Sequence, residues 1–399
     1  MTADGSGPAA GQAAPGPDMA DEAPAGHDDT RPGPSRAERR RRRRGGRGER
    51  LMVPEADFRS YHDRPIIKPP VWKVPDVPAY LYLGGAAGVA ASTAALADLT
   101  CRPGLRRSGR LVAAGGAVAS VAFLIHDLGR PERFLHMMRV FKPTSPLSVG
   151  SWILAPFGTV TGAAAASEVT GLLPGAGRAA GLVGGLLGPA MTTYTAVLLA
   201  DTAVPGWHEA YRELPFVFAG SALAAGGGSA LLTGHGDGPP RRIAVAGAAL
   251  ELVATHRTET AIGMSAHAYR TGRAGRVLRA ARAATLGGLA AALAGPLLDR
   301  LRPGSRRRRR GFDAAAGLLL NAGSAATRWG VFDAGMATAW DPAYTVVPQR
   351  DRLRRREAAR TAEEERGDLG TVPPGEAVTA GDLPGPDPAG AGSDGGPAW

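Results

Sequence analysis

The sequence predicts an all-α protein: a polytopic integral membrane helix bundle of about eight transmembrane helices, flanked by disordered N- and C-terminal tails. Its middle consists of long uncharged runs of Ala, Gly, Leu and Val, whereas both ends are strongly polar. The 57 Gly and 33 Pro among 399 residues argue against one well-packed soluble domain. The apolar runs are too long and too rich in alanine for strands, and they lack period-two alternation, which makes a sheet implausible.

The first expected domain, residues 1–70, is a disordered tail. It is rich in Pro, Gly, Ala and acidic residues and contains the run Arg39–Arg44, so it holds too little apolar surface to offset the entropy of ordering. No apolar stretch follows these arginines closely, so the run is not a twin-arginine export signal. Residues 346–399 have the same character and are expected to form a second disordered tail.

Residues 71–345 are expected to form the transmembrane domain. A helix needs about 20 apolar residues to cross a hydrocarbon core about 30 Å thick. Five runs are clear, the second being shorter: Val77–Ala97, Leu111–Ile125, Thr144–Ser167, Ala179–Ala200 and Leu214–Gly234. Three runs are weaker because they are short or, in the first case, interrupted by Glu251: Ile243–Thr255, Ala283–Leu298 and Ala314–Ala326. We read these three as transmembrane as well, with re-entrant or buried soluble helices as the alternative.

The charge distribution fits a membrane protein better than a nucleic-acid-binding one. The net charge is +11, but arginine concentrates in the tails and in short segments between apolar runs. An even number of crossings places both tails on one side, and their basic character favours the cytoplasm. Arg306–Arg310 would then lie on the other side, against this tendency. Lipid is therefore expected as a partner and nucleic acid is not.

Polar residues gather at the helix ends that the predicted topology brings to the tail side. The second, fourth, sixth and eighth helices all run toward that side, and the ionisable residues at their ends are His126, Asp127, Asp201, His256, Glu259, Arg328 and Asp333. The odd-numbered helices are expected to bring far fewer such groups to the opposite face. Ionisable groups near a bilayer pair, snorkel or line a wet cavity. The pattern predicts a polar pocket or docking surface on the tail side, with ordinary helix-end polarity as the alternative.

The segment from His126 to Trp152 carries the most specific motif. It reads HDLGRPERFLHMMRVFKPTSPLSVGSW, in which Gly129 and Pro131 end a helix and the following mix of basic and apolar residues suits an interfacial helix. This stretch resembles the NrfD/PsrC family, the membrane subunits of polysulfide-reductase-type molybdenum and iron–sulfur enzymes. The resemblance extends over roughly residues 75–345 and excludes the tails.

The resemblance implies a membrane subunit that exchanges electrons between the quinone pool and an iron–sulfur partner. Quinone or quinol, either menaquinone or ubiquinone, would be the substrate. The partners would be a ferredoxin-like four-cluster iron–sulfur subunit and a molybdopterin catalytic subunit. The single cysteine, Cys101, independently excludes Cys-ligated clusters built from this chain alone. No metal site and no haem are expected here, since the family resemblance argues against a haem held by His126 and His256.

Tyr194 and Asp201 are the central site candidates, because the fourth helix looks like the family's quinone-site tyrosine motif. The two residues are seven apart, so they project from nearly the same helix face about 10 Å apart. A phenol can donate a hydrogen bond to a quinone carbonyl, and a carboxylate can relay the accompanying proton; a simply packed aromatic ring is the alternative. The first helix lacks the Asn and His that the family uses, so His126, Asp127 or Tyr82 is expected to supply the second contact.

Two further groups of residues complete the expected site. Glu251, His256 and Glu259 on the sixth helix suggest a proton relay, although Glu251 paired with Arg257 or Arg328 explains the same pattern structurally. Arg130 and Arg133 combine fixed turns with positive charge and are expected to help dock the partner.

Two other classes of function also fit the sequence. Ion or solute transport would use the same polar intramembrane residues and Gly-rich helices, although no internal repeat supports it. A passive anchor that recruits a soluble enzyme to the membrane is the other possibility. The plasma membrane is the expected location in every case.

Overall fold

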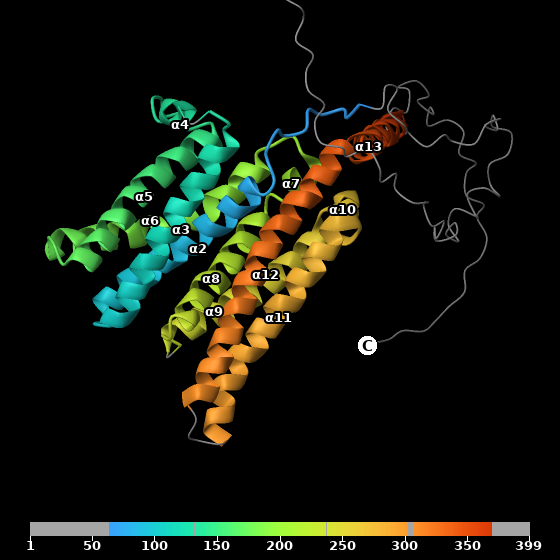
Figure 1. Cartoon of the computed structure of the whole chain (residues 1–399). Coiled ribbons are helices and arrows are strands. Elements are labelled where there is room, and N and C mark those ends of the chain that lie inside the picture. Colours follow the sequence, from blue (N-terminus) through green and yellow to red (C-terminus); the bar gives the residue numbers. More distant parts are fainter. Residues whose placement is uncertain (1–63, 131, 237, 302–305, 369–399) are drawn as a thin grey trace, which may run out of the picture. The chain divides into compact units, whose positions relative to one another are not determined.

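The computed structural model describes residues 64–130, 132–236, 238–301 and 306–368. Eight helices of 19 to 35 residues form the bundle in this part of the chain (Figure 1). They are α2 (Asp76–Leu99), α3 (Pro103–Asp127), α5 (Pro146–Thr170), α6 (Pro174–Ala200), α8 (Leu214–Leu232), α9 (Pro239–Ala261), α11 (Gly272–Leu301) and α12 (Arg306–Trp340). Short elements connect them: α4 (Glu132–Met137), α7 (Pro205–His208), η1 (Gly263–Ser265) and α10 (Ala266–Arg270). A further helix of 26 residues, α13 (Ala343–Asp368), follows α12. The described residues contain no strand, as the sequence predicts.

Local sequence explains where many of these helices begin and end. Several begin at a proline, whose fixed φ suits the first turn and whose missing N–H would have no helical partner there; these residues are Pro103, Pro146, Pro174, Pro205 and Pro239. Helix α5 ends at Gly171, which adopts the left-handed conformation at φ 73°.

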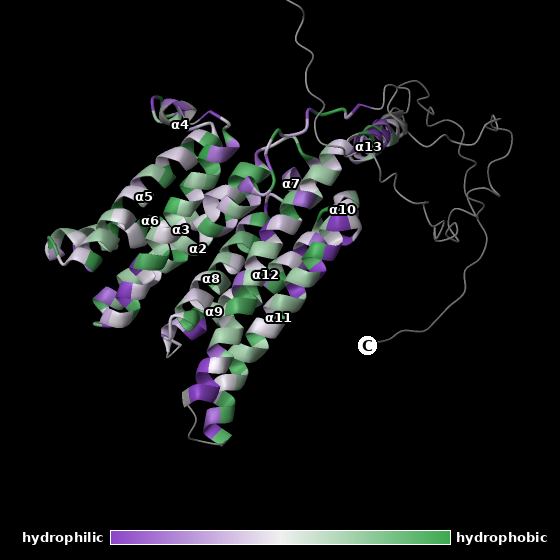
Figure 2. Cartoon of the chain, viewed as in Figure 1, coloured by the Kyte–Doolittle hydropathy of each residue, from purple (hydrophilic) through white to green (hydrophobic). Residues whose placement is uncertain are grey.

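The long helices form two groups of four. Helices α2, α3, α5 and α6 pack on one another, as do α8, α9, α11 and α12, and α8 and α12 join the groups by packing against α2. Six of the eight are long and apolar enough to cross a membrane; α9 and α12 carry more charge and pack against the others. Large apolar side chains such as Val118, Leu186 and Leu318 are exposed on helix surfaces, while polar residues concentrate at helix ends and on α13 (Figure 2). This is the structure of a multi-pass membrane protein.

Glycine lets α2 and α6 approach backbone to backbone. A Cβ on Gly88 would lie 2.6 Å from the carbonyl oxygen of Gly188, so neither position leaves room for a side chain. Nearby, Pro189 has no N–H to donate to the carbonyl of Gly185, and the Ser92 hydroxyl donates to that oxygen instead at 2.8 Å. The two backbones therefore cross at close range, and the Gly185 carbonyl, which lacks its helical donor, accepts a hydrogen bond from Ser92.

The structure differs from the expected tail boundary at the C-terminal side. Residues 346–368, expected to belong to a disordered tail, lie in helix α13. Alternating Arg, Glu and Ala are strong helix formers, and opposite charges three or four residues apart support a solvated helix without a buried face. Residues 1–63 and 369–399, on which most of the disorder expectation falls, lie outside the described residues.

Candidate functional site

The described helices alternate in direction, so one face of the bundle contains the ends of α3, α6, α9 and α12. We call it the tail face; it also contains the starts of α2, α5, α8 and α11. On it, His126 Nδ1 lies 2.6 Å from Asp76 Oδ2, and Asp127 Oδ1 accepts a hydrogen bond from the Lys73 backbone at 2.8 Å. Asp76 is buried, whereas the His126 side chain is 75% exposed. The hydrogen-bonded pair therefore reaches from the buried side of the bundle to a water-exposed imidazole.

Tyr194 shares a small cavity with a second tyrosine. Tyr80, one helical turn beyond Asp76, lines the same small cavity as Tyr194, together with Leu147, Leu198 and other residues of α3 and α5. The Tyr194 ring packs against Gly150, where a Cβ would lie 2.5 Å from the ring. The Tyr194 hydroxyl has no hydrogen-bond partner among the described residues. A free phenol hydroxyl in an apolar cavity is a donor available to a ligand.

Tyr82 does not share this cavity. Its hydroxyl donates to Asn321 Oδ1 on α12 at 2.7 Å, on the other side of α2. Residues 80 and 82 are about 200° apart around a helix. Their side chains therefore project from opposite sides of α2, Tyr82 toward α12 and Tyr80 toward α6. The structure therefore brings Tyr80, not Tyr82, to Tyr194. Sequence reasoning chose Tyr82 rather than Tyr80 as the contact, and it missed Asp76 because it considered charges at the C-terminal ends of helices only.

Asp201 caps the C-terminal end of α6 and is exposed. Its backbone N–H continues the helix by donating to Val197, and no ion pair or hydrogen bond holds its carboxylate among the described residues. It lies beyond Tyr194 toward the surface, as the seven-residue spacing requires, but outside the cavity. The structure thus separates the hydroxyl at the cavity from the carboxylate at the water boundary.

Glu251 is buried at the junction of α9, α11 and α12, surrounded by hydroxyl groups. Thr327 donates to one carboxylate oxygen at 2.5 Å and Thr285 to the other at 3.4 Å. No ion pair joins Glu251 to Arg257 or Arg328 in the described part of the chain. Arg328 is fully buried and instead donates to the backbone of Phe218 and Leu81, with its guanidinium 3.9 Å from the centre of the Phe218 ring.

The three residues of the expected relay do not form a continuous chain. Glu259 accepts a hydrogen bond from Arg282 at 2.6 Å, whereas His256 is exposed. Asp333, at the same end of α12, is paired with Arg273 at 3.3 Å. Glu251 is therefore separated from His256, and the carboxylates nearer the tail face are held by arginines.

The expected docking arginines lie around the turn between α3 and α4. Arg130 is exposed. Arg133 belongs to α4, but its side chain lies outside the described residues. Exposed Val140 and Phe141 follow, and Phe141 packs edge-to-face against Trp152 with ring centres 5.7 Å apart. This part of the tail face combines apolar and basic side chains.

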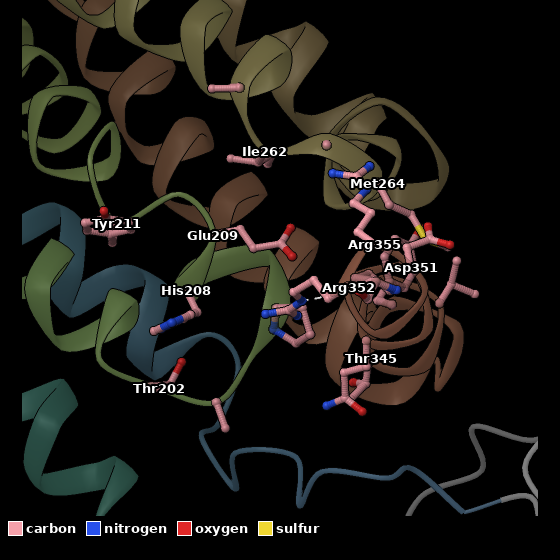
Figure 3. Close-up of a pocket in the computed structure, with 18 residues that line it drawn as sticks. Thr202, His208, Glu209, Tyr211, Ile262, Met264, Thr345, Asp351, Arg352 and Arg355 are labelled. Carbon is pink, nitrogen blue, oxygen red and sulfur yellow. Dashed lines mark hydrogen bonds between the residues drawn. The ribbon is translucent and has the colours of Figure 1, made fainter. Parts of the chain in front are cut away.

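A larger cavity of about 690 Å³ opens on the tail face between α7, η1 and α13 (Figure 3). His208, Glu209, Arg352 and Arg355 contribute charged or polar groups, and none of the expected quinone residues lines it. At its edge, burial raises the pKa of Tyr344 to about 12, and Asp341 adds to the rise, so this phenol stays neutral at pH 7. The cavity is wide and contains charged side chains, unlike the narrow cavity at Tyr194.

The expectation of few ionisable groups on the opposite face is wrong. Asp98, Arg106, Arg110, Glu168 and Arg178 meet there in one ion-pair network at the ends of α2, α3, α5 and α6. A further pair, Arg241–Asp313, joins α9 to α12. Sequence reasoning counted charges inside the apolar runs and overlooked those just outside them, which long arginine side chains bring together.

The fold and the two polar faces define a multi-pass membrane protein with a tyrosine-lined cavity near one surface. Residues 66–235 match the family described as Polysulphide reductase, NrfD. The matched residues include Asp76, Tyr80, His126 and Tyr194, and the match ends before α9. The comparison with curated proteins finds no match.

Proposed function

We propose that the protein is the quinone-reactive membrane subunit of a molybdenum and iron–sulfur oxidoreductase complex. It exchanges electrons between the quinone pool and an iron–sulfur partner subunit. The observation that carries this proposal is the cavity shared by Tyr80 and Tyr194, one helical turn from the water-accessible Asp76–His126 pair. Quinone reduction requires two protons with two electrons, and the arrangement offers a hydrogen-bond donor at the ring and an acid–base pair at the surface.

The cavity fits a quinone head group only after a side chain moves. Its free volume is about 10 Å³, the room of one water molecule. Leu147 lines it and is 48% exposed, so rotation of this side chain opens the cavity toward the tail face. The ring then lies between Tyr80 and Tyr194, with Asp127 and Asp201 nearer to water as proton acceptors.

The partner subunits are proposed to bind the tail face. The family match favours a ferredoxin-like four-cluster subunit and a molybdopterin subunit as these partners. The clusters are assigned to the partner because this chain has only one thiol, Cys101, which is exposed beyond the other end of α2. Arg130 and Arg133 with the neighbouring Phe141 provide the charge and the apolar contact for docking. In this proposal the complex lies in the plasma membrane with the tails in the cytoplasm. Glu251 serves proton movement deeper in the bundle, without a continuous chain of side chains to His256 or Glu259.

The test is to isolate the intact complex from membranes and to measure reduction of its iron–sulfur clusters by menaquinol and ubiquinol analogues. We expect quinol-dependent reduction and co-purification of subunits with cysteine-rich cluster motifs. A passive anchor predicts assembly with the same partners but no dependence on quinol. A transporter predicts neither, and shows ion or solute flux in proteoliposomes without a redox partner.

A further inference from the structure

The ion-pair network on the opposite face is held around two carboxylates. Asp98 at the end of α2 lies 3.2 Å from Arg106 and 3.1 Å from Arg178. Glu168 at the end of α5 lies 3.1 Å from Arg106 and 2.8 Å from Arg110. The side chains of both carboxylates are at most 10% exposed. Four helices thus contribute to one charged cluster where the bundle meets the membrane surface.

The cluster carries more positive than negative charge. Three guanidinium groups face two carboxylates, so the cluster has a net charge of +1 although each arginine has a carboxylate neighbour. Arg106 uses three of its nitrogens on the two carboxylates. Arg178 donates only through Nε to Asp98 and is 61% exposed, and Arg110 Nε is buried without a hydrogen-bond partner. Unpaired charged donors in a partly buried site favour an anion.

The cluster surrounds a cavity of about 480 Å³ that also contains the start of α6. Pro174 and Gly175 line it, no side chain caps this helix, and the Gly175 N–H has no acceptor among the described residues. The N-terminal end of a 27-residue helix adds partial positive charge and free N–H donors to those of the arginines. Guanidinium groups and helix N-termini are the usual ligands of phosphate oxygens.

Exposed apolar side chains lie immediately beside the cavity. Val169, Leu172 and Leu173 at the α5–α6 turn are 62%, 68% and 76% exposed. A free anion makes no use of such residues, whereas the acyl chains of a lipid bound through its headgroup would cover them. The net charge of +1 on the cluster matches the single negative charge of a phosphodiester.

We propose that this cavity binds the phosphate group of an anionic membrane lipid, with Arg178 and the α6 N-terminus as the phosphate ligands and Leu172 and Leu173 against the acyl chains. The site lies at the end of the bundle opposite to Tyr194, and it does not depend on the quinone assignment. A free phosphate ion shares the headgroup chemistry but not the apolar contact, so the two sources are separable by experiment.

The experiment is native mass spectrometry of the full chain, delipidated in detergent and titrated with phosphatidylglycerol or with diacylglycerol of the same chains. We expect binding of phosphatidylglycerol only, weakened roughly five- to tenfold by Arg178→Gln, the loss of one partly exposed charged contact. The matched control is Arg107→Gln, one position along α3 from Arg106, exposed on the same face and without a contact in the network. Thermal unfolding checks that both variants fold.

Inorganic phosphate and a second variant separate the two sources. If the lipid is the ligand, Leu172→Ser/Leu173→Ser weakens phosphatidylglycerol binding, and inorganic phosphate competes only at far higher concentration. If phosphatidylglycerol and inorganic phosphate bind with equal affinity, and only Arg178→Gln weakens both, the cavity is a phosphate site but the proposal of a lipid ligand is refuted. Equal weakening by Arg178→Gln and Arg107→Gln, or binding of diacylglycerol as tight as that of phosphatidylglycerol, would overturn the proposal.

Discussion

Tyr194 offers the sharpest test at the scale of single residues. Tyr194→Phe removes a hydroxyl that has no partner among the described residues, so thermal stability should not change. In the quinone complex the same change leaves a buried carbonyl without its donor, at a cost of about 1–3 kcal/mol. This corresponds to a rate or affinity lowered roughly five- to a hundredfold. Quinol-dependent cluster reduction, measured with equal amounts of assembled complex, checks the expectation, and unchanged kinetics would refute the site.

Tyr82→Phe is the matched control, and it should lower stability without changing the quinol kinetics. It removes the 2.7 Å hydrogen bond to Asn321, so the melting temperature should fall, with a loss of about 1 kcal/mol in unfolding free energy. Quinol kinetics should stay at the level of the unsubstituted complex. A large kinetic effect at Tyr82 without an effect at Tyr194 would place the quinone between α2 and α12 instead.

The two tyrosines of α2 also show which parts of a site can be predicted from the sequence. Tyr194 and His126 are recognisable from their motifs, and the structure places both near the tail face. Tyr80 and Tyr82 are alike in residue type and depth, and only the positions of the neighbouring helices decide which one faces Tyr194. Asp76 was missed because the polarity of a helix start is ordinary until the structure pairs it with His126.

Two glycines of helix α5 differ in what surrounds them: Gly150 contacts the Tyr194 ring, whereas Gly158 faces open space. Gly150→Ala places a methyl group against the Tyr194 ring, so we expect a displaced ring and a loss of quinol-dependent activity comparable to that of Tyr194→Phe. Gly158→Ala in the same helix meets nothing within 4 Å. It should leave activity unchanged and stabilise the helix by up to about 1 kcal/mol. Activity assays and thermal unfolding of both variants distinguish a specific clash from a general effect of glycine loss.

The weaker helices show what hydropathy does and does not reveal about an element. All three weak runs are real helices, and each extends well beyond its apolar part, to 23, 30 and 35 residues in α9, α11 and α12. Their charged residues are tolerated because Arg241 pairs with Asp313 and Glu259 pairs with Arg282 between helices. A sequence shows the charges but not their partners. The helix ends therefore could not be predicted, although the helices could.

For the whole molecule, Cys101 provides a test of membrane orientation. It is exposed just after α2 crosses the bundle, on the face opposite to the tails, and it is the only cysteine in the sequence. If the tails are cytoplasmic, a membrane-impermeant maleimide should label intact cells, with Cys101→Ser as the unlabelled control. Labelling that requires permeabilised cells would reverse the orientation, and with it the compartment in which the partner docks.

The close crossing of α2 and α6 links the two ends of the molecule mechanically. Gly88 and Gly188 bring the backbones together, with Tyr80 and Tyr194 about 12 Å or less along the helices toward one end and the Asp98–Arg178 pair about 15 Å toward the other. If the proposed lipid moves Asp98 relative to Arg178, α2 tilts against α6, and the same tilt changes the distance between Tyr80 and Tyr194 at the other end.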